Sequence, residues 1–114
     1  MASPPAYDPE DPPDRPVDLP DGEALADLVD TYARVVVEFY TDGCGVCASM
    51  EPVLSGVSRS GVVVGTINPR DDPPLVDDYQ IASVPTFVQF VDGDPVDRLA
   101  DGFVPIEELQ AFAE

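Results

Sequence analysis

One run of β-branched and aromatic residues, Val35-Val36-Val37-Glu38-Phe39-Tyr40, constrains the fold most strongly. Such a nearly continuous apolar run is typical of a strand that is covered on both faces of its sheet. Helices must then pack on both sides of that sheet. The sequence therefore predicts an α/β fold.

The flanking segments provide these helices and further strands. Leu25, Leu28, Val29 and Tyr32 recur at helical spacing, and Asp92-Gly93 is a hairpin signal. Pro52 falls inside the second predicted helix and should kink it. The chain order implies one mixed sheet between two helical layers. The predicted helices cover residues 25–32, 44–57, 75–79 and 106–112, and the predicted strands cover 35–40, 62–67, 85–91 and 96–100.

Residues 1–20 differ in composition from the rest of the chain. They hold seven of the fourteen prolines, mixed with acidic residues, and bury too little apolar surface to offset their ordering entropy. We expect a disordered, acidic, proline-rich tail over residues 1–20, in which Val17–Leu19 can add a short edge strand, and one domain over 21–114. The start of the chain is neither basic nor apolar, so we expect a cytoplasmic protein.

The charge limits the partners. The formal net charge is −18, and all five basic residues are Arg. This surface repels phosphates and anionic lipids, and no run reaches the ~20 apolar residues of a membrane span, so we expect neither nucleic acid nor membrane as a partner. At molar salt the Debye length is only ~3 Å, so the ions screen the repulsion among the carboxylates. The composition therefore suits a very saline cytoplasm and resembles that of halophile proteins; the alternative is that acidity only aids solubility.

Cys44 and Cys47 lie where the predicted central strand gives way to a helix. A thiol at a helix N-terminus meets unpaired N–H groups and the positive end of the helix dipole, which lowers the pKa of Cys44 and raises its reactivity. Cys47, one turn later and buried, can resolve a mixed disulfide formed by Cys44. A structural staple is a weaker alternative, because closing so short a loop contributes only ~2 kcal/mol. We expect no metal site, because zinc needs about four ligands and the chain has two Cys and no His.

The stretch VVVEFYTDGCGVCASMEP, residues 35–52, resembles the active-site region of thioredoxins. Ser83-Val84-Pro85-Thr86, followed by an apolar strand and Asp92-Gly93, is a second match, and Gly102 before the last helix is a third. The resemblance covers residues 22–114. It implies a thioredoxin fold, a three-layer α/β/α sandwich with a central mixed sheet, and a thiol–disulfide oxidoreductase that reduces protein disulfides.

The resemblance also implies roles for single residues. Cys44 is the nucleophile and Cys47 the resolving thiol. Pro85, after a cis peptide bond, faces the cysteines and leaves room for a substrate strand, while the Val84 backbone pairs with that strand. Gly45 and Val46, between the cysteines, complete the expected substrate-binding residues.

Glu38 occupies the strand position where thioredoxins often have a buried Asp. Alternation places it on the same face as Val36, beneath the Cys44 loop, where a buried carboxyl with a raised pKa can accept the proton of Cys47. The alternative is that Glu38 points into solvent and water carries the proton.

The chain departs from the thioredoxin pattern at three positions. Gly43 stands where Trp is usual, Val46 replaces the Pro between the cysteines, and Thr66 lies where a Lys often accompanies the buried acid. These changes leave open an oxidase or isomerase, and a binding module that keeps the fold without turnover. The glycines form no dinucleotide fingerprint. We therefore expect no cofactor. The resemblance implies that electrons come from a separate thioredoxin reductase or an equivalent donor, and we expect a monomer.

Overall fold

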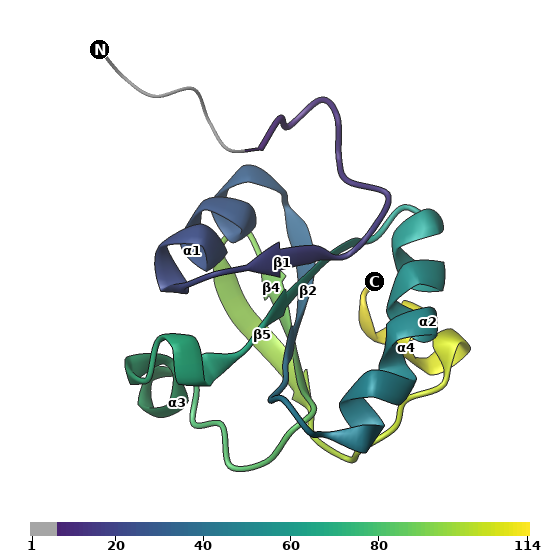
Figure 1. Ribbon diagram of the computed structural model, residues 1–114. Coiled ribbons are helices and arrows are strands. Elements are labelled where there is room, and N and C mark those ends of the chain that lie inside the picture. Colours follow the sequence, from purple (N-terminus) through teal and green to yellow (C-terminus); the bar gives the residue numbers. More distant parts are fainter. Residues whose placement is uncertain (1–6) are drawn as a thin grey trace.

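Strand β2 (Arg34–Phe39) lies at the centre of the sheet in the computed structural model, which describes residues 7–114. The sheet order is β1-β3-β2-β4-β5 (Figure 1). Strands β1 (Val17–Leu19) and β3 (Val63–Ile67) run parallel to β2, whereas β4 (Thr86–Val91) runs antiparallel to β2 and to β5 (Asp94–Leu99). Every residue of β2 after Arg34 is buried, as its apolar run predicts.

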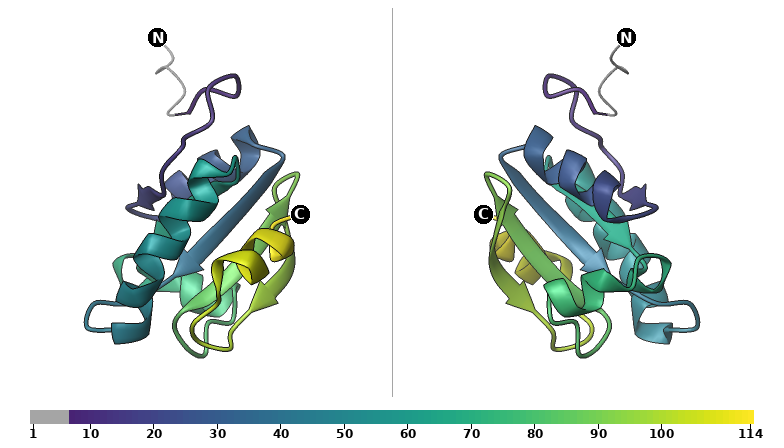
Figure 2. Two further views of the ribbon diagram at one scale, coloured as in Figure 1. Left: turned by 90° about the vertical axis from the view of Figure 1, so that its right-hand side faces the viewer. Right: turned by 90° about the vertical axis from the view of Figure 1, so that its left-hand side faces the viewer.

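Two helical layers cover the sheet (Figure 2). Helices α1 (Gly22–Thr31) and α3 (Pro74–Asp78) pack on one face, with η1 (Pro69–Asp71), a short 3₁₀ turn, before α3. Helices α2 (Gly45–Arg59) and α4 (Ile106–Phe112) pack on the other. Side chains of β2 alternate between the two cores, with Val35, Val37 and Phe39 in the first and Val36 in the second. This is the predicted three-layer α/β/α sandwich with a mixed sheet.

Local chemistry explains the start of α1, the turn between β4 and β5, and a close contact within the sheet. The Asp21 carboxylate accepts a hydrogen bond from the Ala24 amide at 2.9 Å and so caps α1. Asp92 and Gly93 have φ angles of 51° and 86°, which a tight turn between two antiparallel strands requires. Gly65 on β3 leaves room for two leucines, because a Cβ there would lie 2.9 Å from both Leu19 and Leu28.

The predicted elements are present, with boundaries shifted by a few residues. Cys44 is the N-cap of α2 rather than its first residue, and β5 begins at Asp94, so Pro95 lies inside that exposed strand rather than before it. Pro52 lies within α2, as predicted. No helix among residues 7–114 is long and apolar enough to cross a bilayer.

Part of the N-terminal segment contacts the sandwich. Residues 1–6 lie outside the described residues, and the division at residue 21 stays a prediction. Within residues 7–20, β1 pairs with β3 as the edge strand that the sequence allowed, and Leu19 is only 4% exposed. Tyr7 packs against the α1 core, and the Tyr32 hydroxyl donates to the Asp8 carbonyl at 2.8 Å. This segment therefore lies against the sandwich, with β1 along the edge of β3.

Candidate active site

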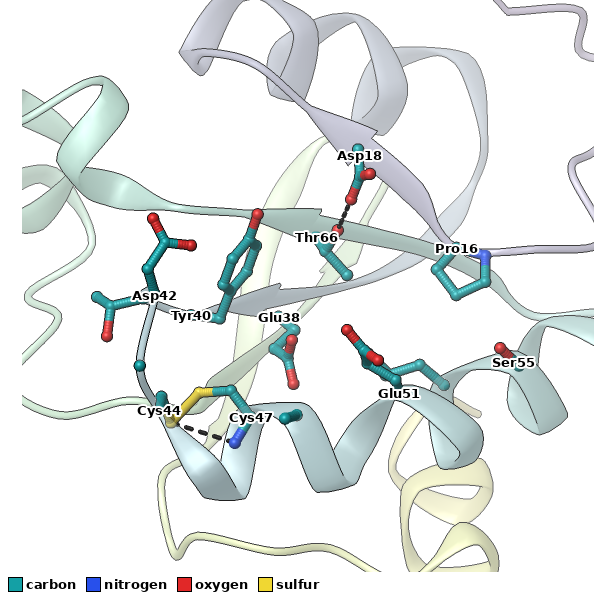
Figure 3. A pocket seen from close by; sticks show the side chains of 14 residues that line it. Pro16, Asp18, Glu38, Tyr40, Asp42, Cys44, Cys47, Glu51, Ser55 and Thr66 are labelled. Carbon is teal, nitrogen blue, oxygen red and sulfur yellow. Dashed lines mark hydrogen bonds between the residues drawn. A yellow bond between two sulfur atoms is a disulfide. The ribbon is translucent and has the colours of Figure 1, made fainter.

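Cys44 and Cys47 form a disulfide at the start of α2, with their Cα atoms 5.2 Å apart. As the N-cap residue, Cys44 accepts a hydrogen bond through its Sγ from the Cys47 amide at 3.1 Å (Figure 3). Cys44 is half-buried, whereas Cys47 is 5% exposed. Only one sulfur of the pair is thus open to a partner, and an amide dipole favours negative charge on it.

A cavity of about 600 Å³ lies behind this disulfide, between α2 and the sheet. It lies toward the carboxyl ends of the parallel strands β3 and β2, where α/β folds commonly hold their sites. Both cysteines line it, together with Glu38 from β2 and Thr66 from β3. The remaining lining residues are Pro16, Asp18, Tyr40, Thr41, Asp42, Gly43, Ala48, Glu51, Leu54 and Ser55.

Glu38 lies at the bottom of the cavity. Its side chain is 3% exposed, and its Oε2 has no hydrogen-bond partner. Burial raises the pKa of Glu38 from 4.5 to about 8, and the Glu51 carboxylate adds to this rise. The alternative that Glu38 points into solvent is therefore wrong for the described structure. A carboxyl with this pKa carries a proton at neutral pH and can exchange it.

The cavity is acidic throughout. Asp18, Glu38, Asp42 and Glu51 line it, and no arginine among residues 7–114 does. The Asp18 carboxylate accepts a hydrogen bond from the Thr66 hydroxyl at 2.7 Å, at the position where thioredoxins often carry a Lys. Within the described part of the chain, no group of three or more His, Cys, Asp or Glu is arranged to hold a metal ion. The cavity lining therefore offers carboxyl groups without a compensating positive charge.

The four predicted substrate-binding residues lie outside the cavity lining. Pro85 is buried and follows a cis Val84–Pro85 bond at the start of β4. The next residue, Thr86, pairs with Phe39 at the end of β2, so Pro85 reaches the same edge of the sheet as the cysteine loop. Gly45 and Val46 are exposed on the first turn of α2. Gly45 and Val46 thus lie between the two cysteines in the sequence, and Pro85 lies at the same edge of the sheet.

Sequence reasoning missed Glu51 and Asp18. Glu51 follows Cys47 by four residues on one helix, a spacing that places both on the same face and could have drawn attention to it. Asp18 carries no such signal, because it reaches the cavity only through the pairing of β1 with β3.

A model of the thioredoxin family, described as Thioredoxin, matches residues 21–114. The chain belongs to the thioredoxin family. Its similarity to a solved thioredoxin supports the same assignment. A single-residue mutant of the thioredoxin from Halobacterium salinarum NRC-1 superimposes with a TM-score of 0.85 at 28% identity, over 90% of this chain and 91% of that one.

Two curated thioredoxin relatives align with parts of their length. Thioredoxin from Chlamydia caviae is 36% identical over 67 residues, which are 57% of this chain and 66% of that protein. The bifunctional thioredoxin reductase/thioredoxin of Mycobacterium leprae is 28% identical over 86 residues, which are 73% of this chain and 19% of that protein. The chain thus spans less than two thirds of either relative's length.

Proposed function

We propose that this protein is a thiol–disulfide oxidoreductase that reduces protein disulfides by dithiol exchange through Cys44 and Cys47. The observation that carries the proposal is the asymmetric disulfide at the N-terminus of α2, with Cys44 half-buried at the cap and Cys47 5% exposed. Membership of the thioredoxin family supports the same chemistry.

The exchange begins with both cysteines reduced. The Cys44 thiolate attacks one sulfur of a partner disulfide and releases the other sulfur as a thiolate, which leaves a mixed disulfide. Cys47 then loses its proton and attacks Cys44 Sγ. The second partner thiolate leaves, and the Cys44–Cys47 disulfide forms. The partner gains two electrons, and the cysteine pair loses them.

Glu38 is the proposed acceptor of the Cys47 proton. Both side chains line one cavity, and the Glu38 pKa of about 8 lies close to the ~8.5 of an ordinary thiol. Proton transfer between groups of matched pKa needs little driving force. Because only the ionised carboxylate accepts a proton, release of the partner should speed up as pH rises toward 8.

The outer side of the disulfide is the proposed docking surface for the partner. Val46 is 42% exposed beside Cys44, and a proline at position 85 offers no backbone N–H. An extended partner segment would lie between Gly45-Val46 and Val84-Pro85 and pair with the Val84 backbone, as the thioredoxin resemblance implies.

A separate thioredoxin reductase is the proposed electron donor. The relative from M. leprae carries both names, thioredoxin reductase and thioredoxin, in one protein, which supports a pairing of these two activities. We further propose that the protein works in a saline cytoplasm, where salt screens the self-repulsion of its net charge of −18, and that it acts there as a monomer.

Two serine variants test the order of attack. Cys44→Ser should abolish reduction of insulin with dithiothreitol as donor, and should trap no partner. After exposure to a protein disulfide without dithiothreitol, Cys47→Ser should form a mixed disulfide that persists on non-reducing electrophoresis, because the resolving thiol is missing. Equal trapping by both variants would contradict the assigned order. The reduction potential of the Cys44–Cys47 pair, measured against glutathione, separates a reductase from an oxidase or isomerase.

A further inference from the structure

Every charged group around Glu38 has the same sign. Figure 3 shows the cavity with side chains that converge from the helix and from the strands. No arginine of the described chain lines the cavity, and among residues 7–114 the one ion pair joins Arg15 to Asp14 on the surface. The other strands beside Glu38 contribute uncharged residues, Thr66 from β3 and Phe87, its register partner on β4. The other titratable groups that line the cavity are Asp18 from β1, Tyr40 and Asp42 after β2, and Cys44, Cys47 and Glu51 at α2.

The three other carboxylates of the cavity differ in their hydrogen bonds and in their position relative to Glu38. Asp18 already accepts a hydrogen bond from the Thr66 hydroxyl, and Asp42 is exposed on the loop before Cys44. Glu51 reaches from α2 toward Glu38, one helical turn after Cys47 (Figure 3). Glu51 is exposed to solvent, whereas the buried Glu38 has an oxygen without any partner.

Two carboxyls that share a cavity cannot both ionise without cost, so the more solvated one loses its proton first. We propose that Glu51 is a positioning residue for the disulfide chemistry: its charge holds a proton on Glu38 and so sets the pH at which Glu38 can receive the proton of Cys47. The inference rests on the proposed function of Glu38. It agrees with the part that Glu51 plays in raising the Glu38 pKa.

Salt sensitivity follows from the same geometry. An exposed charge such as Glu51 is screened by ions, since the Debye length falls from ~10 Å at 0.1 M to ~3 Å at 1 M. The burial that raises the Glu38 pKa is not screened. Salt should therefore lower the Glu38 pKa mainly through Glu51, and the site should release its partner at a lower pH in concentrated KCl than in dilute buffer.

Carbon-13 NMR titration of the Glu38 carboxyl in the oxidised protein tests the electrostatic step directly. Glu51→Gln should lower the Glu38 pKa by about half a pH unit in dilute buffer. Asp42→Asn, which removes an exposed charge from the same cavity, should lower it less, and Glu51→Asp should retain most of the wild-type value. In molar KCl the wild type and Glu51→Gln should converge. Equal Glu38 titrations in the wild type and Glu51→Gln in dilute buffer would overturn the proposal.

Rapid mixing of the reduced protein with a protein disulfide tests the chemical step. The pH midpoint of partner release should move down in Glu51→Gln by the same amount as the Glu38 pKa, and formation of the mixed disulfide should not move. If Glu38→Gln slows release but the Glu51→Gln midpoint stays at the wild-type pH, Glu51 has no positioning role while the role of Glu38 stands. If Glu38→Gln releases the partner at the wild-type rate, Glu38 is not the acceptor, and the inference falls with it.

Discussion

The buried carboxyl of Glu38 should make the protein less stable as pH rises, and Glu38→Gln should remove this effect. Gln keeps the shape of the side chain but cannot ionise. Glu38 has a pKa of about 8 in the fold against 4.5 ordinarily, so the folded state holds the proton more tightly. Stability from the protonated form is therefore fully present below pH 4.5 and is lost as pH rises toward 8.

The size of the effect follows from the same two values. Each pH unit between them changes the free energy of unfolding by about 1.4 kcal/mol. At pH 7 the stability gained by Glu38→Gln should reach up to about 3 kcal/mol, and near pH 8 it should level off at no more than about 5 kcal/mol. With a urea slope of about 1–3 kcal/mol per molar, the midpoint should move by up to about 1–3 M at pH 7.

Urea unfolding of the oxidised wild type and Glu38→Gln, from about pH 4.5 to 8.5 at constant KCl, measures this difference. Asp42→Asn is the matched control, because it removes one negative charge from an exposed side chain of the same cavity. Its stability should stay within about 0.5 kcal/mol of the wild type at every pH. A gap between Glu38→Gln and the wild type that is the same at both ends of the pH series would refute the reasoning.

Three further outcomes are expected. The melting temperature should rise from dilute buffer to molar KCl, steeply at first, because 23 acidic residues face only five basic ones; a flat thermal melt series would contradict this. Leu19→Ala should lower the unfolding free energy by about 2 kcal/mol or more in urea, since Leu19 is 4% exposed; a change below about 0.5 kcal/mol, the size of a typical surface effect, would show that β1 adds nothing. Gly65→Ala should lower the free energy of unfolding by about 1–3 kcal/mol, because the added methyl group would crowd Leu19 and Leu28. Gly45→Ala, with open space around it, should not destabilise the protein, and equal losses of stability in the two variants would argue against crowding.

The sheet and its helical layers could be predicted because each element carries its own periodicity. The apolar run of β2 requires cover on both faces, and the cysteine spacing after it marks the start of α2. The burial of Glu38 also followed from alternation along β2, since Val36 faces the α2 core.

The acidic surroundings of Glu38 could not be predicted in the same way. Asp18 lies in a segment whose composition indicates disorder, and it reaches Thr66 only because β1 pairs with β3. Register between distant strands is a tertiary property that local pattern does not encode. The Tyr32 hydroxyl likewise binds the Asp8 carbonyl across 24 residues, a contact with no local signature.

The pairing of β1 with β3 also bears on how the chain folds. The Asp18–Thr66 bond joins residues 48 apart, and α1, β2 and α2 all lie between them. Closing so long a loop has an entropic cost that local helices and the β4–β5 hairpin do not bear. We expect β1 to pair with β3 late in folding, after α2 has formed and brought Cys44 and Cys47 together. During synthesis Cys44 and Cys47 are made before β3, so both cysteines are present before the cavity that they will line.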